Sequence, residues 1–440
     1  MLAFGSGSRA RAVLRGFERA AFRLPTSVRA GNGRLFTGAL CVALLAACAS
    51  GKPPVDPPVQ PAVVTPPPAV SAPKTFSGKD LPPLDSDPAV ITVAAVGDMM
   101  IGTDYPKNIL PDDDGVGFFK DVTPILAAAD TTFGNLEGTL LDGGEPVKVC
   151  KVPENCYLFR TPTRYAQYYK DAGFDVLSLA NNHACDFGEA GRESSMKTLD
   201  AVGILHSGRA GDVARWNVKG RRFAMIAFAP NVGAHQLNEL ATAKTLVTQL
   251  AAQNDVVIVS FHGGAEGDGA EHLTFAHEIF HEEDRGNVVE FARAMVDAGA
   301  DLVLGHGPHV ARAMELYHDR LIAYSLGNFA TYYGIGVTGN RGIAPILIAS
   351  IRGDGRFVGA KLIPTVQIRP AGPSVDPEKR VLNLIRGLTQ ESFPNGELAF
   401  APSGEITRRS VAKSDSSTAT PPTAPRAPAG RASSPATGGT

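Results

Sequence analysis

The placement of proline most limits how this chain can fold. Of the 33 prolines in 440 residues, 12 lie in residues 51–90 and 6 in residues 401–440. Proline fixes its own φ angle and has no backbone N–H to donate, so proline-dense stretches extend and do not join helices or sheets. A packed domain is therefore expected between roughly residues 91 and 400, which is long enough for one sizeable hydrophobic core.

The first 47 residues have the features of an export signal. They contain seven arginines, followed by an apolar stretch at 35–47 that is too short to span a membrane. The sequence Leu-Ala-Ala-Cys at 45–48 resembles the lipobox of bacterial lipoproteins, in which the cysteine is lipidated. We expect residues 1–47 to be a lipoprotein-type signal peptide and Cys48 to hold the protein on a lipid membrane, at the periplasmic or cell-surface side. An ordinary secretory signal is the alternative.

Both flanks of the expected domain have the composition of unfolded chain. Residues 48–88, rich in Pro, Val and Ala, predict an extended linker, and residues 401–440, rich in Ser, Thr, Ala, Pro and Gly, predict a disordered tail. Residues 371–400 form a C-terminal extension that includes a candidate helix. Removing residues 1–47, whose balance is +6, changes the formal net charge from −2 to −8. No basic stripe with interleaved aromatic residues is present, so nucleic acid is not expected as a partner.

Three cysteines remain in the expected domain after Cys48. Cys150 and Cys156 flank a Lys-Val-Pro-Glu-Asn turn, and we expect them to form a disulfide that closes this small loop, although sequence alone does not give their geometry. Cys185 is then left over, and it is interpreted as a buried small hydrophobic residue.

Short β-branched segments alternate with amphipathic segments, which is the pattern of an α/β protein. Strands are expected at 89–96, 131–136, 174–179, 223–228, 255–261, 301–304, 321–325 and 344–351. Helices are expected at 117–129, 163–172, 188–202, 238–253 and 287–298. Strand-like segments follow one another beyond residue 311. A two-sheet β-sandwich flanked by helices, covering residues 89–370, is therefore preferred to one doubly wound sheet.

Side chains that can bind metals follow five of the predicted strands. They are Asp98, Glu137, Asn182, His183, His262, His306 and His309. Ligands of α/β sheets bind outside the carboxyl ends of the strands, so these loops should converge on one site. Nitrogen and oxygen donors suit Mn, Fe, Zn or Mg, and one or two such divalent ions can drive hydrolysis. A single Asp or His after a strand is usually structural, but five such strand ends favour a common site.

Six motifs, in order, resemble those of a known family. They are Gly-Asp-Met-Met at 97–100, Asn-Leu-Glu-Gly at 135–138, Ala-Asn-Asn-His at 180–183 with Asp-Phe-Gly at 186–188, His-Gly-Gly-Ala-Glu at 262–266, Gly-His-Gly-Pro-His-Val at 305–310 and Tyr-Ser-Leu-Gly-Asn-Phe at 324–329. They resemble the CapA family of capsule or poly-γ-glutamate biosynthesis proteins, which looks like a branch of the calcineurin-like metallophosphoesterases. The resemblance runs from about residue 91 to 365 and implies a β-sandwich flanked by helices.

The resemblance also implies a metal-binding role for six residues. In it, Asp98 and His309 bind one metal, Asn182, His262 and His306 bind the other, and Glu137 bridges the two. The wider phosphoesterase pattern has an aspartate as the bridging ligand and a histidine two residues after the first Asp, where this chain has Met100. The first metal therefore loses a ligand.

Three further residues receive catalytic roles from the same resemblance. His183 would be the general acid or would stabilise developing charge, while Asp186 and Glu266 would orient His183 and the ligand histidines. Gly307 stands where the family's own version of the motif commonly has a second histidine.

The expected function is that of a lipid-anchored, extracytoplasmic, metal-dependent hydrolase-like protein in capsule, exopolymer or cell-envelope metabolism. An anionic polymer or phosphoester would be its substrate, and either a phosphoester or a γ-glutamyl amide bond could be cut. Alternatively, the domain is a non-catalytic accessory protein that binds the polymer at a capsule export or synthesis complex. Because the mature protein is acidic, a cationic mouth would have to come from metals or from Arg160, Arg164 and Arg341.

One motif points to a different class of enzyme. His277-Glu278-Ile-Phe-His281 fits the His-Glu-x-x-His pattern, which on a helix places two zinc ligands on one face with the glutamate as general base. The segment is strongly charged and lacks the apolar helix of such peptidases. A solvated helix or an insertion loop is therefore preferred to the peptidase site.

Overall fold

The computed structural model describes residues 90–149 and 156–409. The predicted signal peptide, Cys48, the Pro-rich linker, Cys150 and the tail beyond residue 409 lie outside the described residues. Within the described ranges, no helix combines the length and the apolar character that a bilayer span requires.

The larger sheet contains ten strands, with β1 near its middle. Its main order is β20 (Leu398–Phe400), β21 (Glu405–Arg408), β18 (Phe357–Gln367), β17 (Ile343–Arg352), β1 (Val90–Met100), β2 (Thr131–Leu136), β5 (Val176–Ser178) and β6 (Leu205–Ser207). In addition, β16 (Asn328–Thr331) pairs with β1, and β19 (Pro373–Val375) pairs with β18. The run from β1 to β6 is parallel, whereas β17 and β18 are antiparallel to their neighbours.

The second sheet contains seven strands. Its order is β14 (Met314–Tyr317), β15 (Arg320–Ala323), β13 (Leu302–His306), β10 (Val256–His262), β8 (Arg221–Ala229) and β7 (Ala214–Val218), and β9 (His235–Gln236) pairs with β8. Two small pairs complete the strands: β3 (Thr139–Leu140) with β4 (Arg160–Thr161), and β11 (Ile279–Phe280) with β12 (Glu283–Asp284).

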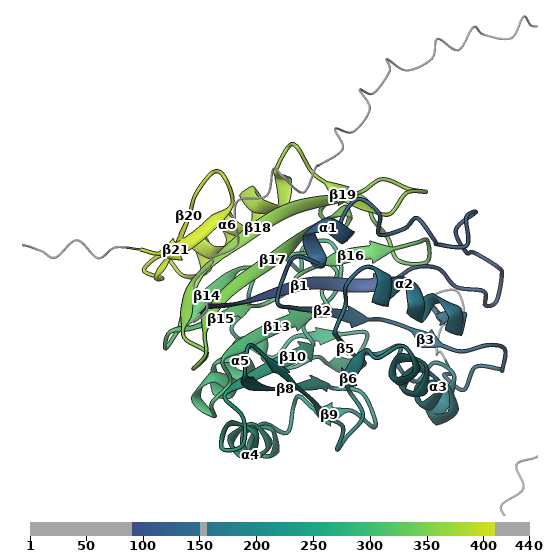
Figure 1. Cartoon of the computed structure of the whole chain (residues 1–440), viewed down its shortest axis with the longest axis horizontal. Helices are drawn as coiled ribbons and strands as arrows, with labels where there is room; N and C mark the ends of the chain where they lie inside the picture. The colour runs from purple at the N-terminus through teal and green to yellow at the C-terminus, as the bar shows by residue number, and fades with distance from the viewer. Residues whose placement is uncertain (1–89, 150–155, 410–440) are drawn as a thin grey trace, which may run out of the picture. The chain divides into compact units, whose positions relative to one another are not determined.

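Six α-helices and two short 3₁₀ turns are present in the described part of the chain. They are α1 (Thr123–Leu126), α2 (Ala166–Asp171), α3 (Gly188–Ala201), α4 (Leu240–Ala251), α5 (Val288–Asp297), α6 (Arg380–Ser392), η3 (Thr163–Tyr165) and η4 (Gly339–Gly342). Figure 1 shows α4 and α5 beside the second sheet, and α2 and α3 beside the larger one.

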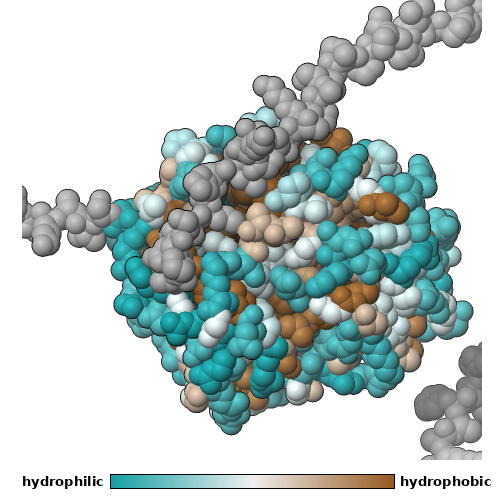
Figure 2. Space-filling view, viewed as in Figure 1, coloured by the Kyte–Doolittle hydropathy of each residue, from teal (hydrophilic) through white to brown (hydrophobic). Residues whose placement is uncertain are grey.

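Three hydrophobic clusters define the layers. Alternate residues of β1 point to opposite faces, so that Val93 and Ala95 pack against the second sheet while Ala94 and Val96 pack under α1, α2 and α3. The outer face of the second sheet packs on α4 and α5. These layers confirm the predicted two-sheet sandwich flanked by helices. On the face seen in Figure 2, hydrophilic residues predominate and hydrophobic ones are scattered.

Three predictions differ clearly from the structure. The helix expected at 117–129 shrinks to α1, because the Asp113 carboxylate accepts from the backbone N–H groups of Gly115 and Gly117 and holds turns there. Residues 401–409, predicted to be disordered, are folded, since β21 pairs with β18 and buries Ile406. The predicted extension is also part of the sandwich, because α6 packs Val381 and Ile385 into the core between the sheets.

Candidate metal centre

The predicted site residues lie where strands of both sheets end. Asp98 is near the end of β1, and Glu137 follows β2 directly. His262 and His306 are the last residues of β10 and β13, and they are paired partners in the parallel ladder. The carboxyl ends of parallel strands share one edge of a sheet, so the fold brings together side chains that are far apart in sequence.

The backbone at the end of β1 places the Asp98 carboxylate in the interior. The Asp98 N–H donates to Gly327 O at 2.8 Å, and the pairing with β16 shifts its register at this point. A Cβ atom at Gly97 would lie only 1.9 Å from Gly327 O. Glycine at position 97 therefore permits the close approach of the two chains that buries Asp98 completely.

Four side chains surround one small space. One ligand atom each of Asp98, Glu137 and His262 lies within 4.8 Å of the others. His309 reaches the same space, with Nδ1 at 3.1 Å from Asp98 Oδ2 and Nε2 at 3.5 Å from Glu137 Oε1. His262 Nε2 is 3.8 Å from that same Glu137 oxygen.

Several buried polar atoms at this place have no hydrogen-bond partner among the residues that the structure describes. They are both carboxylate oxygens of Glu137, both ring nitrogens of His262, Nδ1 of His306 and Oδ1 of Asn182. His306 Nε2 lies 3.2 Å from Val96 O, which leaves Nδ1 as its ligand atom. Unpaired buried donors and acceptors are costly, and this mixture of carboxylate, imidazole and amide suits divalent cations. The residues present therefore fit one or two divalent metal ions.

The crowding of buried charges shifts several pKa values. Burial raises the pKa of Glu137 to about 8, against the opposing effect of His309 and with a further rise from Asp98. Burial alone would lower the pKa of His309, but the Glu137 and Asp98 carboxylates outweigh it and raise that pKa to about 10. Burial, followed by the charge of Arg285, lowers the pKa of His262 well below its usual range. The lowered pKa favours the neutral imidazole of His262, which is the form that binds metals, whereas His309 would have to release its proton to bind one.

His183 lies beside this space in a fixed orientation. Its Nδ1 is 2.8 Å from Asp186 Oδ2, and its ring packs against Phe159 with centroids 4.3 Å apart. Asp186 also contacts Lys148 Nζ at 3.0 Å and accepts from the backbone N–H of Phe159. Lys148 in turn donates to Asn182 O. With Nδ1 engaged by Asp186, Nε2 is the ring atom left for chemistry.

Two asparagines that the sequence analysis did not single out orient the ligands. Asn135 Nδ2 donates to Asp98 Oδ1 at 2.8 Å, and Asn328 Oδ1 lies 2.9 Å from His309 Nδ1. Asn328 is itself held by bonds from its Nδ2 to two backbone carbonyl groups. Both asparagines stand inside the quoted motifs, so the motifs were the signal that could have identified them. Such hydrogen-bonded supports fix the orientation of metal ligands.

Glu266 lies between the site and a buried arginine. Its Oε1 is 3.0 Å from Arg285 Nη1, and its Oε2 is 3.7 Å from His309 Nε2. Of the two carboxylates predicted to orient His183 and the ligand histidines, Asp186 contacts His183 and Glu266 lies near His309. The three arginines considered for a cationic mouth, Arg160, Arg164 and Arg341, each form an ion pair with an aspartate.

The His-Glu-x-x-His motif does not lie on a helix, so the helical arrangement considered for it is wrong. Residues 279 and 280 form β11 of a hairpin, so the two histidines do not share a helix face. His277 is exposed and pairs with Asp284, while Glu278 is buried and pairs with Arg312 through two bonds of 2.9 and 2.8 Å. The motif therefore lacks the geometry of a zinc peptidase.

Two of the three cysteines of the domain lie in the described residues. Cys156 is disulfide-bonded, and its predicted partner Cys150 lies outside the described residues. Cys185 is a free, partly buried thiol.

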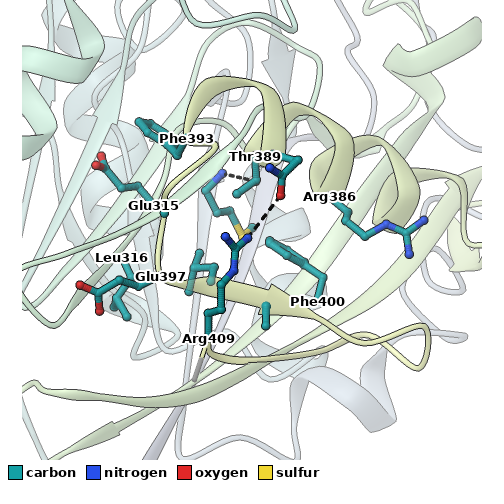
Figure 3. A pocket seen from close by; sticks show the side chains of 13 residues that line it. Glu315, Leu316, Arg386, Thr389, Phe393, Glu397, Phe400 and Arg409 are labelled. Carbon is teal, nitrogen blue, oxygen red and sulfur yellow. Dashed lines mark hydrogen bonds between the residues drawn. The ribbon is translucent and has the colours of Figure 1, made fainter. Parts of the chain in front are cut away.

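A separate cavity of about 210 Å³ opens between β14, α6 and β20 (Figure 3). Its lining mixes acidic, basic and apolar side chains, among them Glu315, Arg386, Phe393 and Arg409. None of the predicted ligands lines it. A second cavity, of about 360 Å³, is lined by Asn182 together with Asn181 and Lys148, and none of the other proposed ligands lines it.

The chain is similar in sequence to proteins of bacterial capsule synthesis. A family model described as bacterial capsule synthesis protein PGA_cap matches residues 92–333. The chain is 29% identical over 333 residues to the PGA biosynthesis protein CapA of Bacillus subtilis (strain 168), covering 71% of this chain and 82% of that protein. It is 30% identical over 263 residues to the capsule biosynthesis protein CapA of Bacillus anthracis, covering 54% and 59%. A crystal structure of a 5'-nucleotidase precursor from Thermus thermophilus matches with a TM-score of 0.34 and 13% identity, over 69% of this chain and 59% of that chain.

Proposed function

This chain belongs to the bacterial capsule synthesis protein family PGA_cap, and we propose that it is a metal-dependent hydrolase acting on an anionic substrate in capsule, exopolymer or cell-envelope metabolism. The single observation that carries the proposal is the set of buried ligand atoms without hydrogen-bond partners within the described residues, above all those of Glu137 and His262. A structural polar cluster would pair such atoms with one another. Atoms left facing a common space suit a bound cation.

The proposal gives each side chain a task. Asp98 and His309 would hold one ion, Asn182, His262 and His306 would hold the other, and Glu137 would lie between them. Divalent ions there would supply Lewis-acid polarisation of a substrate oxygen. The ion held by Asp98 and His309 lacks a histidine ligand, because Met100 stands at that position. The ion held by Asn182, His262 and His306 therefore has the more complete set of ligands. The asparagines at 135 and 328 would keep Asp98 and His309 oriented.

His183 would handle the proton. In a hydrolysis, the oxygen of water joins phosphorus or the carbonyl carbon, the bond to the leaving oxygen or nitrogen breaks, and that leaving atom takes up a proton. Because Asp186 holds Nδ1 of His183, Nε2 of the imidazolium form would be positioned to deliver that proton, and the ring would take up a new one from water before the next turnover. The same contact fixes the ring, so little reorganisation is needed when the substrate binds.

The proposed hydrolase could cut either a phosphoester bond or a γ-glutamyl amide bond. Relatives named for PGA or capsule biosynthesis favour a polymer carrying many carboxylates. The proposed ion ligands serve a phosphoester and a γ-glutamyl amide equally well, since both develop negative charge on oxygen during hydrolysis. Both classes of substrate therefore belong in the assay.

The location proposed for this activity is the outer side of a membrane, with the protein held by lipid on Cys48. The support is the Arg-rich lead, the apolar stretch and the lipobox-like Leu-Ala-Ala-Cys sequence. Incorporation of a labelled fatty acid into the wild type, and its loss in Cys48→Ser, tests the anchor. Equal labelling of both proteins would contradict it.

The main experiment measures metal content and turnover on the same purified samples. Wild type would be assayed on p-nitrophenyl phosphate, bis-p-nitrophenyl phosphate and γ-glutamyl p-nitroanilide, with bound metals quantified by mass spectrometry. Asp98→Ala with His306→Ala should lose metal and activity together. The matched control, His277→Ala with His281→Ala, removes two histidines from the hairpin and should retain both. The opposite pattern would restore the peptidase hypothesis.

Metal retention without turnover of any substrate would contradict hydrolysis. That result would support the alternative role of a polymer-binding accessory protein at an export or synthesis complex.

A further inference from the structure

Arg285 is the largest charged side chain buried beside the metal centre. It is 1% exposed and directly follows β12 of the hairpin. Its backbone N–H donates to Glu278 O at 2.8 Å, and its carbonyl accepts from Gly264 N at 2.9 Å. The hairpin is thereby fixed on the loop that follows β10, and the Arg285 side chain is held beside the predicted ligands.

Within the described residues, only one end of the Arg285 guanidinium group has partners. Nη1 lies 3.0 Å from Glu266 Oε1 and 3.3 Å from Glu283 Oε2. Nε and Nη2 are buried and have no hydrogen-bond partner among residues 90–149 and 156–409. These two nitrogens form one edge of the planar group, with parallel N–H bonds that match the two oxygens of a carboxylate or phosphate.

The free edge adjoins the metal-binding loop. A Cβ atom at Gly307, which lies between His306 and His309 in sequence, would come within 3.2 Å of Arg285 Nη2 and within 2.8 Å of the backbone of Gly263. Gly307 has a φ of +112°, in the region that favours glycine. Glycine at position 307 therefore permits the close approach of Nη2 and the Gly263 backbone to the segment that joins His306 to His309.

An arginine edge that is buried and unpaired is unfavourable unless something binds it. Leaving charged donors desolvated without acceptors costs more than leaving neutral ones. Glu266 and Glu283 satisfy only Nη1, so an ion pair within the hairpin does not account for the orientation of the other edge. An anionic ligand next to the metal ions would satisfy the edge and would also screen the repulsion between Arg285 and the ions.

We propose that Arg285 is a substrate-positioning residue whose Nε and Nη2 bind two anionic oxygens, of a phosphoryl group or a carboxylate, beside the metal centre. This inference rests on the proposed function, because it assigns that site its anion-recognising group. It adds a residue from a hairpin that none of the six motifs contains.

The test is anion binding to the metal-loaded protein, measured by isothermal titration calorimetry with inorganic phosphate and, separately, with glutarate. The variants are Arg285→Gln and Arg285→Lys. The matched control is Arg356→Gln, which removes an arginine from the surface, where its partner is Asp354. Metal content and melting temperature are measured on every sample.

Arg285→Gln should bind the preferred anion roughly 10- to 100-fold more weakly than wild type, because two charge-assisted hydrogen bonds are lost. Arg285→Lys should be intermediate, since it keeps the charge without the planar edge, and Arg356→Gln should match wild type. The larger loss, with phosphate or with glutarate, identifies the oxyanion class. If Arg285→Gln does not fold, Arg285→Lys carries the test.

Unchanged anion affinity in both Arg285 variants at equal metal content would overturn the inference, and so would absence of anion binding in wild type. A purely structural arginine would lower the melting temperature without changing that affinity. The proposed hydrolase function fails separately, if wild type binds metal and anion yet hydrolyses no substrate.

Discussion

The buried pair of Glu278 and Arg312 gives the sharpest test of the role of the hairpin. Arg312 is fully buried, and the side chain of Glu278 is 3% exposed. Two bonds join their ends, Arg312 Nε also donates to Ala270 O, and Glu278 Oε2 accepts from the backbone N–H of Ala265. The pair therefore connects the hairpin to the loop after β10 and to the loop that precedes β14.

Glu278→Gln should destabilise the protein by about 3 kcal/mol. Removing one partner of a buried pair costs about 3–5 kcal/mol, because the other charge stays buried without compensation. The lower end is expected here, since glutamine still accepts one bond and the Ala270 carbonyl still contacts Arg312. At about 2 °C per kcal/mol for a large domain, the melting temperature should fall by roughly 6 °C.

Urea unfolding followed by circular dichroism measures this change, and a double-mutant cycle with Arg312→Met isolates the pair. A coupling of about 2 kcal/mol or more between Glu278→Gln and Arg312→Met is expected. Glu278→Gln within about 0.5 kcal/mol of wild type, with no coupling, would refute the reasoning. Loss of hydrolysis at full stability would instead indicate that Glu278 is a general base.

Three further predictions concern other regions. Burial raises the pKa of Asp301 to about 6. Between pH 4 and 6 the folded protein therefore holds a proton that the unfolded chain has lost. The free energy of unfolding should then fall by up to about 3 kcal/mol as the pH rises through this range. Asp301→Asn should flatten that dependence in urea titrations at several pH values. Gly97→Ala should lower the free energy of unfolding by more than about 3 kcal/mol in the same assay, because the new Cβ would lie 1.9 Å from a carbonyl oxygen. Gly387→Ala, at a position on α6 with open space around it, should raise the free energy of unfolding by about 0.5–1 kcal/mol. Asn328→Ala should weaken metal affinity roughly 10- to 100-fold by releasing His309, and an unchanged affinity in competition with a chelator would contradict that role.

The sequence predicted the parts of the fold that depend on local patterns. The strand at 131–136 matches β2, and the helix at 188–202 matches α3 within one residue, because hydrophobic periodicity and bounding turn residues act locally. The helix at 117–129 failed because side-chain bonds from Asp113 compete with helical bonds there. Periodicity does not register that competition.

The residues of the candidate site that lie within the six sequence motifs could be predicted. Asp98, Glu137, His262 and His309 come together because each ends or follows a strand, and strand ends are visible in the sequence. The contribution of Arg285 was not predictable. It depends on a hairpin folding back onto the loop after β10, a contact between distant segments for which the local sequence gives no signal.

The candidate ligands come from both sheets of the sandwich. Asp98 lies in β1 and Glu137 directly follows β2, both strands of the larger sheet, whereas His262 and His306 end strands of the second sheet. A bound ion would therefore act as a cross-link between two layers that otherwise meet mainly through nonpolar side chains. Metal loading should make the two sheets one cooperative unit, so that amide hydrogen exchange slows in β1 and β10 together. The metal would then govern how the protein unfolds as well as the hydrolysis proposed for it.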